Sequence, residues 1–373
     1  MFTIIMEIDT SIFARAVSEN RMKKIRLGKT EIMVSRVGMG GIPITRPPLD
    51  EAIKVVNKAL DLGVNFIDTA IAYSTSEERI GQAIEGRRNE VILTTKTWAG
   101  TRELALEQLE TSLNRLRTKY LDIWQFHGIN SMEKYDQIMS LGGAYEAALE
   151  ALDDGRVRHI GFSSHSLEVA LKLVASGNFE TVQFPFNFIS REAADTLVPL
   201  AKEHDVGFIA MKPFAGGMIK DANLAIKYVL QFDNVLPDPG IEKLSDITEI
   251  VDIVNGPWGI SPDESEEIEA IYVKTGNRFC RQCGYCGPCP NGVIIPGLMY
   301  LERLYELWPP ERFFTWSYVL DSAKSGENCT ECGLCEPKCP YSLPIRKMIK
   351  EMLEFFKGKQ MERARSYFLH TNR

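Results

Sequence analysis

Residues 64–73 read VNFIDTAIAY, and this stretch decides the fold. It starts with the apolar pattern of a buried strand and ends in a polar turn. The turn carries an acid, Asp68, and five residues later a phenol, Tyr73. The stretch therefore predicts a strand with two groups able to move or orient protons at its carboxyl end.

Two further strand-like runs end in the same way. Residues 91–95 stop at Lys96, and residues 121–126 stop at His127. If the strands are parallel in one closed sheet, side chains at their carboxyl ends meet at one mouth of that sheet. Most of the chain can thus be interpreted as the means of bringing these groups together.

Strand-like runs and helical patterns alternate along the chain after an expected hairpin around Gly28 and Lys29. Residues 102–117, for example, place leucines at helical spacing on one face. Eight βα units favour an α/β fold of the (β/α)8 TIM barrel type over an open sheet. We expect the barrel strands at 34–39, 64–67, 91–95, 121–126, 159–162, 181–184, 207–210 and, with a weaker pattern, near Val235.

The chain of 373 residues is long enough for a large barrel and a small second domain. Composition changes near residues 256–263, where Gly and Pro gather as in a linker. We therefore predict an N-terminal extension at 1–21, a barrel at 22–258 and a mainly helical second domain at 259–373. The extension is either a ragged terminus or a short amphipathic helix packed on the outside.

Bulk charge and hydropathy exclude several classes of function. The net charge of −7 and the pI near 5.5 argue against a nucleic-acid partner. No apolar run reaches the ~20 residues that a membrane helix needs. The first 20 residues carry acids early and lack the basic start of a signal peptide, so we expect a cytoplasmic location and no membrane contact.

The four polar groups are the set that carbonyl reduction needs. Tyrosine is a weak acid with a pKa of ~10, and an ammonium beside it lowers that pKa. The set resembles the catalytic tetrad of the aldo-keto reductase superfamily, with its DTAxxY motif at 68–73. The resemblance implies that Tyr73 is the acid, Lys96 and Asp68 its activators, and His127 the group that orients the carbonyl. It also places Trp98, two residues past Lys96, at the substrate pocket.

Resemblance to the same superfamily implies a nicotinamide cofactor held on barrel loops. No dinucleotide fingerprint follows the first strand, so a two-domain Rossmann dehydrogenase is not expected. The implied contacts come from strand ends for the carboxamide, from the loop at 210–217 for the pyrophosphate, and from residues 239–249 for the adenosine end. The residues expected to bind the cofactor are Gly40, Gly41, Ser163, Ser164, Gln183, Met211, Lys212, Pro213, Gly217, Gly240, Lys243 and Glu249.

Three departures from the superfamily pattern bear on the cofactor. Ser164 replaces an asparagine, and Met211 stands where many members stack an aromatic ring. The adenosine-end segment offers Lys243 but no arginine cluster for a 2′-phosphate, so we expect NADH to serve at least as well as NADPH. Glu249 is either an adenine contact or an exposed helix glutamate.

All eight cysteines lie between residues 280 and 339, which indicates metal binding and not a disulfide scaffold. The second run, C-x2-C-x2-C-x3-C-P, is the bacterial ferredoxin pattern, and the first is one residue shorter. In that pattern the fourth cysteine ligates the other cluster, which implies two [4Fe–4S] clusters with crossed ligands. Two zinc sites are the alternative. The sets are Cys280, Cys283, Cys286 and Cys339 for one cluster, and Cys329, Cys332, Cys335 and Cys289 for the other.

These patterns together predict NAD(P)H-dependent reduction of an aldehyde or ketone, or the reverse oxidation, in a barrel joined to a ferredoxin-like domain. Hydride transfer moves two electrons together, whereas each cluster accepts only one. Three roles for the clusters therefore stay open: an electron relay, a structural support of the C-terminal domain, or a redox sensor. Alternatively, the chain is an electron-transfer subunit or redox sensor whose barrel is mainly a docking platform. The expected partners are a small carbonyl substrate and a ferredoxin or flavoprotein. The basic residues Lys357, Lys359, Arg363 and Arg365 form either a solvated helix face or a docking site for an acidic partner.

Overall fold

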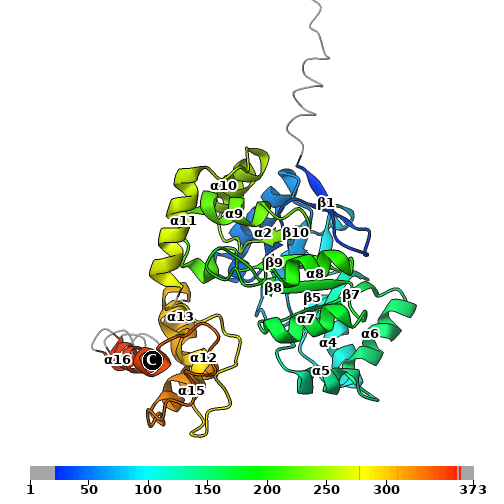
Figure 1. Ribbon diagram of the computed structural model, residues 1–373. Coiled ribbons are helices and arrows are strands. Elements are labelled where there is room, and N and C mark those ends of the chain that lie inside the picture. The colour runs from blue at the N-terminus through cyan, green and yellow to red at the C-terminus, as the bar shows by residue number, and fades with distance from the viewer. Residues whose placement is uncertain (1–21, 277, 309, 359–360, 363–373) are drawn as a thin grey trace, which may run out of the picture.

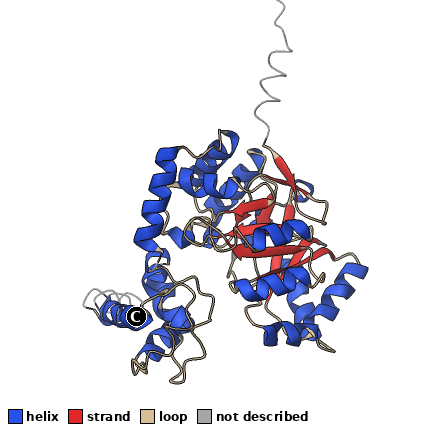
Figure 2. Cartoon of the chain, viewed as in Figure 1, coloured by secondary structure: helices blue, strands red, loops and turns tan. Residues whose placement is uncertain are grey.

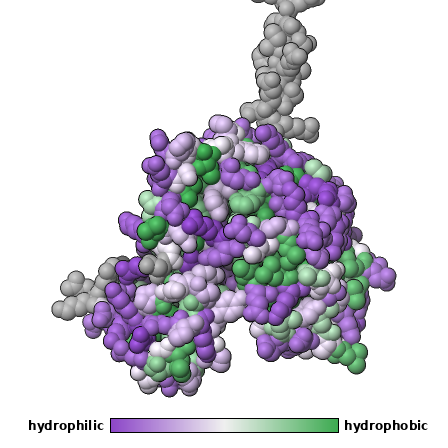
Figure 3. Space-filling model, in the orientation of Figure 1, coloured by the Kyte–Doolittle hydropathy of each residue, from purple (hydrophilic) through white to green (hydrophobic). Residues whose placement is uncertain are grey.

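The computed structural model describes residues 22–276, 278–308, 310–358 and 361–362. The expected N-terminal extension at 1–21 lies outside the described residues. Figure 1 shows a barrel of strands and helices, with a smaller helical part beside it that ends the chain. Helix α11 (Pro262–Thr275) runs down one side of the barrel and leads into this C-terminal part. Figure 3 shows a mostly hydrophilic face with a notch between the two parts.

Eight parallel strands form the barrel sheet in chain order, and helices surround it (Figure 2). The strands are β3 (Met39–Gly40), β4 (Phe66–Asp68), β5 (Ile92–Thr97), β6 (Leu121–Phe126), β7 (Val157–Ser163), β8 (Thr181–Pro185), β9 (Gly207–Met211) and β10 (Val235–Asp238). The helices are α2 (Leu49–Asp61), α3 (Ser76–Ala83), α4 (Arg102–Arg115), α5 (Met132–Met139), α6 (Ala144–Asp153), α7 (Leu167–Ala175), α8 (Leu197–Glu203), α9 (Ala222–Leu230) and α10 (Leu244–Asn255).

The last strand returns to the first, so the sheet is nearly closed. Gly40 forms a parallel bridge with Gly240, and the amide of Gly38 donates to the carbonyl of Pro237 at 2.8 Å. The predicted (β/α)8 barrel is thereby confirmed. Closure matters for function because it gathers the carboxyl ends of all eight strands around one opening.

The sequence placed two strands imprecisely. The run expected at 34–39 is divided between β2 (Met33–Ser35) and β3 because β2 pairs antiparallel with β1 (Lys24–Arg26) in the expected hairpin. Strand β5 extends to Thr97, so Lys96 lies inside the strand and not after it. This extension makes Lys96 one of the buried polar residues of the barrel.

The hairpin β1–β2 covers the end of the barrel opposite the strands' carboxyl ends. Leu27 joins a buried cluster with Phe66, Ile123 and Ile209 from inside the barrel. Gly28 has a positive φ of 54° and forms an antiparallel bridge with Val206, so close that a Cβ at Gly28 would collide with the backbone at Gly207. The hairpin thus plugs one end and leaves the other for chemistry.

The C-terminal part has its own apolar core, which includes Leu298, Phe313, Val319 and Ile349. Partly buried cysteines pack against this core. Its helices after α11 are α12 (Ile295–Leu298), α13 (Leu301–Leu307), α14 (Pro310–Thr315), α15 (Ser317–Gly326) and α16 (Ile345–Lys357). Within the described ranges, no helix is both long and apolar enough to span a bilayer.

Candidate active site

The four tetrad candidates converge at the carboxyl ends of β4, β5 and β6. Asp68 is the last residue of β4, Lys96 is next to last in β5, and His127 directly follows β6. Tyr73 reaches the same place from a turn after β4, in which its amide donates to the carbonyl of Ala70 at 2.9 Å. Parallel pairing of β4 with β5 and of β5 with β6 sets the register that brings these groups together.

Lys96 is the centre of the group. Its ammonium donates to Asp68 Oδ1 at 2.6 Å, to Asp68 Oδ2 at 2.5 Å and to the carbonyl of Thr69 at 2.7 Å. Its side chain is only 1% exposed. Burial lowers the pKa of Lys96, but the negative charge and the hydrogen bonds of Asp68 act against burial, and the pKa stays above its usual value. Lys96 therefore stays positively charged, 5.0 Å from the ring centre of Tyr73.

Tyr73 and His127 face each other edge to face, with ring centres 5.7 Å apart. Burial raises the pKa of Tyr73, and Lys96 opposes this as expected without reversing it. Lys96 thus acts on the pKa of Tyr73 in the expected direction, and burial acts against it more strongly. Burial and the cations Lys96 and Lys212 lower the pKa of His127 to about 3. A neutral imidazole and a protonated phenol thus share the pocket.

Sequence reasoning missed Asp238, a second carboxyl beside the tetrad. It ends β10, is buried, and accepts a hydrogen bond from Gln183 Nε2 at 3.1 Å through Oδ2. Its Oδ1 has no hydrogen-bond partner among the described residues. Burial and the nearby Asp68 raise the pKa of Asp238 well above its usual value. Since Lys96 bonds both oxygens of Asp68, we assign the proton to Asp238. The available signal was an acid at a strand end, in the run Leu-Pro-Asp-Pro.

The expected carboxamide contacts lie next to the tetrad on β7 and β8. Ser163 accepts a hydrogen bond from the amide of Gly128 at 2.9 Å, and Ser164 donates to the carbonyl of Ile129 at 2.7 Å. Both serines and Gln183 are buried. Trp98 lies at the same rim with 51% of its surface exposed. These residues surround the opening, although their side chains are engaged within the protein.

The loop after β9 is a tight turn rich in glycine. Met211 ends the strand, Lys212 follows with a positive φ of 57°, and Pro213 leads into the short turn η3 (Ala215–Gly217). Gly216 and Gly217 have φ values of 66° and 94°, which only glycine adopts easily. A Cβ at Gly216 would meet the hydroxyl of Tyr300, and one at Gly217 would meet the guanidinium of Arg303, so this turn packs closely against the C-terminal part.

Lys212 and His165 form a half-buried pair that the sequence did not predict. The ammonium of Lys212 donates to His165 Nε2 at 3.0 Å and to Gln282 Oε1 at 2.9 Å. Burial, together with the charge of Lys212, lowers the pKa of His165 well below its usual value. Burial also lowers the pKa of Lys212 to about 8, against the opposing charge of Cys280. The two hydrogen-bond acceptors of this cation are therefore neutral.

The remaining cofactor candidates lie where the barrel closes. Gly40 and Gly240 make the closing bridge, and a Cβ at Gly41 would come within 2.7 Å of the carbonyl of Asp68. Lys243 caps helix α10, with its amide 2.9 Å from Asp246 Oδ2, and both Lys243 and Glu249 are exposed.

Sequence reasoning also missed Arg46, which follows the short helix η1 (Pro43–Thr45) in the first loop. Its Nη1 pairs with Glu242 Oε2 at 2.7 Å in the last loop. Arg46 thus adds a cation next to the adenosine-end segment.

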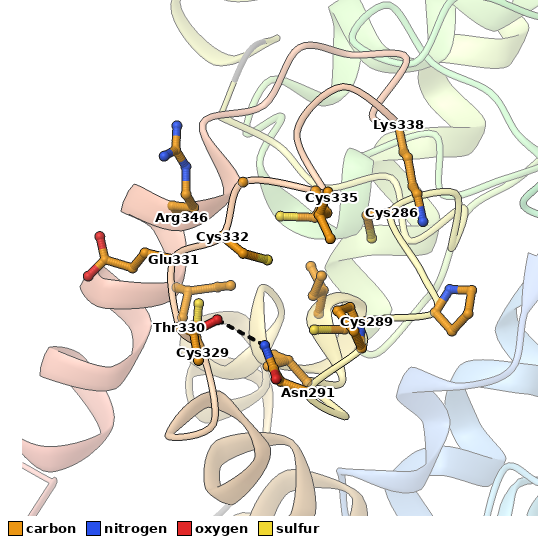
Figure 4. A pocket seen from close by; sticks show the side chains of 17 residues that line it. Cys286, Cys289, Asn291, Cys329, Thr330, Glu331, Cys332, Cys335, Lys338 and Arg346 are labelled. Carbon is orange, nitrogen blue, oxygen red and sulfur yellow. Dashed lines mark hydrogen bonds between the residues drawn. The ribbon is translucent and has the colours of Figure 1, made fainter.

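The cysteine side chains line two cavities, and in neither cavity do they converge on a single point. Cys280, Cys283, Cys286 and Cys339 line one cavity. The second is lined by Cys286, Cys289, Cys329, Cys332 and Cys335 (Figure 4). Within the described part of the chain, no three His, Cys, Asp or Glu side chains converge as ligands of a single ion. Four thiols around a cavity suit a cubane, and Cys339 lies with the first set as crossed ligation requires.

The two cysteine runs form a structural repeat. Gln282 and Glu331 each follow the first cysteine of a run by two residues, and both have positive φ values, 61° and 56°. Gly284 and Gly333 each follow the first cysteine of a run by four residues, and their φ values are 83° and 79°. Each run then leads into a helix, α12 or α16, after a Cys-Pro pair.

Of the basic tail, only Lys357 can be placed, in an ion pair with Glu327 at 2.7 Å. Lys359, Arg363 and Arg365 lie outside the described residues.

Comparisons with known proteins agree with this architecture. The family described as Aldo/keto reductase family matches residues 36–264, more than half of the chain, and a 4Fe-4S dicluster domain matches residues 279–343. The aldo-keto reductase YhdN of Bacillus subtilis (strain 168) is 31% identical over 242 residues, covering 60% of this chain and 71% of that protein. The uncharacterized oxidoreductase YqkF of the same strain is 30% identical over 217 residues, covering 54% and 68%.

Solved structures show the same fold. The aldo-keto reductase AKR11C1 of Bacillus halodurans in its holo form superposes with a TM-score of 0.59 at 24% identity, over 67% of this chain and 96% of its own. An aldo/keto reductase from Klebsiella pneumoniae, solved in complex with NADP and acetate, gives 0.58 at 22% identity over 67% and 95%. The chain therefore belongs to the aldo/keto reductase family of oxidoreductases and carries a 4Fe-4S dicluster domain at its C-terminal end.

Proposed function

We propose that the protein reduces an aldehyde or ketone with NAD(P)H, or runs the reverse oxidation, and holds two [4Fe–4S] clusters. The observation that carries the proposal is Lys96, buried and bonded to both oxygens of Asp68 beside Tyr73 and His127. Structures of related reductases containing NADP or NADPH support the choice of cofactor. When bound, the nicotinamide supplies a hydride.

The chain's own residues handle the proton and the developing charge. Tyr73 donates its phenolic proton to the carbonyl oxygen, since its raised pKa keeps it protonated. Lys96 stabilises the phenolate that this leaves, and Asp68 holds the ammonium in place. His127, neutral because its pKa is about 3, can donate a hydrogen bond to the carbonyl oxygen and fix its direction.

Resemblance to the family places the loop after β9 along the dinucleotide, and the ammonium of Lys212 supplies positive charge at its start. For the clusters, the donor sets are four thiols each, with Cys339 in the first set and Cys289 in the second. When bound, such clusters accept and donate single electrons.

The Tyr73→Phe variant tests the acid. The variant keeps the ring and its contact with His127 but has no proton to donate. General acid catalysis contributes about 10²- to 10⁴-fold, so kcat should fall by this factor with little change in cofactor affinity. Tyr135→Phe is the matched control because its hydroxyl bonds only Asn178 among the described residues, away from the pocket. Unchanged turnover in Tyr73→Phe with cofactor bound would contradict the assignment.

An electron-transfer function is the second candidate, and exposure of the second cysteine set favours it. Cys332 is exposed, and Leu334 beside it has 56% of its surface exposed. A small one-electron carrier could approach a cluster there. Steady NAD(P)H-dependent carbonyl turnover by the isolated chain separates the two functions, since a docking platform should show none.

A further inference from the structure

The side chains between the cysteines of the first run hold that run against the barrel. Arg281 is 6% exposed and donates through Nη2 to the carbonyl of Ile189 at 2.8 Å. Gln282 accepts a hydrogen bond from Lys212 at 2.9 Å. The hydroxyl of Tyr285 accepts a hydrogen bond from an amide in the first turn of α7 at 3.1 Å. The site of the first cluster is thus fixed to the rim of the barrel opening.

The second cysteine run faces away from this interface. In the described chain, the hydrogen bonds and ion pairs of its intervening side chains stay within the C-terminal part. Glu331 pairs with Lys350 at 2.8 Å, and Thr330 accepts a hydrogen bond from Asn291 at 2.9 Å (Figure 4). Cys332 is exposed. Only the first cluster site therefore has a direct connection to barrel side chains within the described residues.

Lys212 carries positive charge from the barrel to the first cluster site. Its ammonium donates to two neutral acceptors, His165 Nε2 at 3.0 Å and Gln282 Oε1 at 2.9 Å. Lys212 also lines one cavity together with Cys280, a ligand of the first set. Burial raises the pKa of the Cys280 thiol to about 11, and the charge of Lys212 acts in the opposite direction. The half-buried ammonium therefore acts directly on a ligand of the first cluster.

Other cations near the two cysteine sets are either balanced by carboxylates or exposed to water. Arg281 lines the first cavity and pairs with Glu192 at 3.3 Å. Lys338 and Arg346 line the second cavity, and both are exposed. Arg346 in addition pairs with Glu336 at 2.7 Å. Water and salt screen exposed charges, so the charges around the second set act more weakly than that of Lys212.

The reduction potential of an iron–sulfur cluster depends on the net charge around it, on hydrogen bonds to its sulfurs and on its exposure to solvent. Reduction adds one negative charge to the cluster. A cation nearby stabilises the reduced state more than the oxidised state, and this raises the potential.

We propose that Lys212, a residue of the barrel, raises the reduction potential of the first cluster and links that cluster to the barrel opening. The inference rests on the two clusters of the proposed function. Lys212 stabilises the extra negative charge that the first cluster carries after it accepts one electron from a one-electron donor, which is itself oxidised by one electron. The same ammonium lies near enough to His127 to lower its pKa, so the cluster and the tetrad share one cation.

The test is a redox titration of the anaerobically prepared full chain with dithionite at pH 7, followed by electron paramagnetic resonance. Cys283→Ser and Cys332→Ser identify the signals of the first and the second cluster, because these cysteines belong to different sets. The titration compares the wild type with Lys212→Gln, which removes the charge, and with Lys212→Arg, which keeps it. Lys202→Gln is the control because it removes the same charge from an exposed ion pair on α8.

At a fixed potential, Lys212→Gln should lower the ratio of reduced to oxidised first cluster by about 5- to 30-fold. This change corresponds to a potential about 40–90 mV lower, at 59 mV per tenfold for one electron. The second cluster should change by less than about 2-fold, since exposed charges are screened. Lys212→Arg and Lys202→Gln should match the wild type within the same factor, about 2-fold.

A second variant, Gln282→Glu, keeps the test available if Lys212→Gln does not fold or does not take up its clusters. Glutamate has the shape of glutamine and can still accept the hydrogen bond from Lys212, but its charge offsets that of the ammonium. Gln282→Glu should therefore lower the potential of the first cluster as well, and leave that of the second cluster unchanged.

Two outcomes overturn the inference while the proposed function stands. In one, Lys212→Gln and Gln282→Glu leave the potential of the first cluster at its wild-type value. In the other, Lys212→Arg lowers this potential as much as Lys212→Gln does, which would indicate a change of structure and not of charge. If the wild type contains zinc or no reducible cluster, the proposed cluster content itself fails, and this inference fails with it.

Discussion

Replacing Asp238 by asparagine tests the assignment of a protonated carboxyl beside the tetrad. Asparagine has the same shape, and its carbonyl can still accept the hydrogen bond from Gln183. What it removes is a group whose pKa is raised well above the ordinary value by burial and by Asp68. The prediction concerns the free energy of unfolding as a function of pH.

The sign follows from proton counts in the two states. At pH values above the unfolded pKa and below the folded pKa, the unfolded chain carries Asp238 ionised, whereas the folded protein keeps it protonated. Unfolding then releases one proton, so the stability of the wild type falls as pH rises, by about 1.4 kcal/mol per pH unit. The loss begins near the unfolded pKa and ends at the folded pKa. Asparagine does not titrate. The free energy of unfolding of Asp238→Asn should therefore rise relative to that of the wild type by this amount per pH unit.

Unfolding curves at several pH values measure the effect. A change of 1 kcal/mol shifts the melting temperature of a domain of this size by about 2–4 °C. The difference in melting temperature between Asp238→Asn and the wild type should therefore increase by roughly 3–6 °C per pH unit. Trp124 is buried in β6 and reports on the barrel by fluorescence. Asp233→Asn is the control: Asp233 pairs with Lys202 and has a lowered pKa, so removing it should shift the curve without changing its slope. Parallel curves for Asp238→Asn and wild type would refute the reasoning.

Three further predictions concern the cofactor, the clusters and the pH profile. NADH should be used at least as well as NADPH, because residues 239–246 carry Lys243 and no arginine; initial rates that strongly favour NADPH would show another phosphate site. Anaerobically prepared protein should contain close to eight iron and eight sulfide per chain, the content of two cubanes. Cys339→Ser should damage the cluster of residues 280–286, as electron paramagnetic resonance of the reduced variant can show, and selective loss of the other cluster would contradict crossed ligation. Because the pKa of His127 is about 3, kcat for reduction should be flat from about pH 5 to 8, and an inflection near pH 6.5 that His127→Asn abolishes would contradict a neutral imidazole.

The sequence predicted correctly those features that are encoded within a short stretch of the chain. Strand and helix periodicity within each βα unit predicted the barrel, and the spacing of Asp68 and Tyr73 placed both at one strand end. The cysteine spacings likewise identified the iron–sulfur part, because a short run of thiols fixes its own ligand geometry. The parallel barrel then brings these strand ends together, because the carboxyl ends of its strands all lie at one end of the barrel, independent of loop sequence.

Only the tertiary structure brought together the groups that come from distant parts of the chain. Asp238 meets Asp68 because β10 closes the barrel near β3, and closure is not encoded in any one segment. The balance of burial against the charge of Lys96 at Tyr73 likewise depends on how completely the finished pocket excludes water. Arg303 reaches Gly216 across 87 positions of sequence, through a contact that exists only once the C-terminal part has docked on the barrel. The sequence specified which groups are present, and packing across the closed barrel decided which of them meet and at what charge.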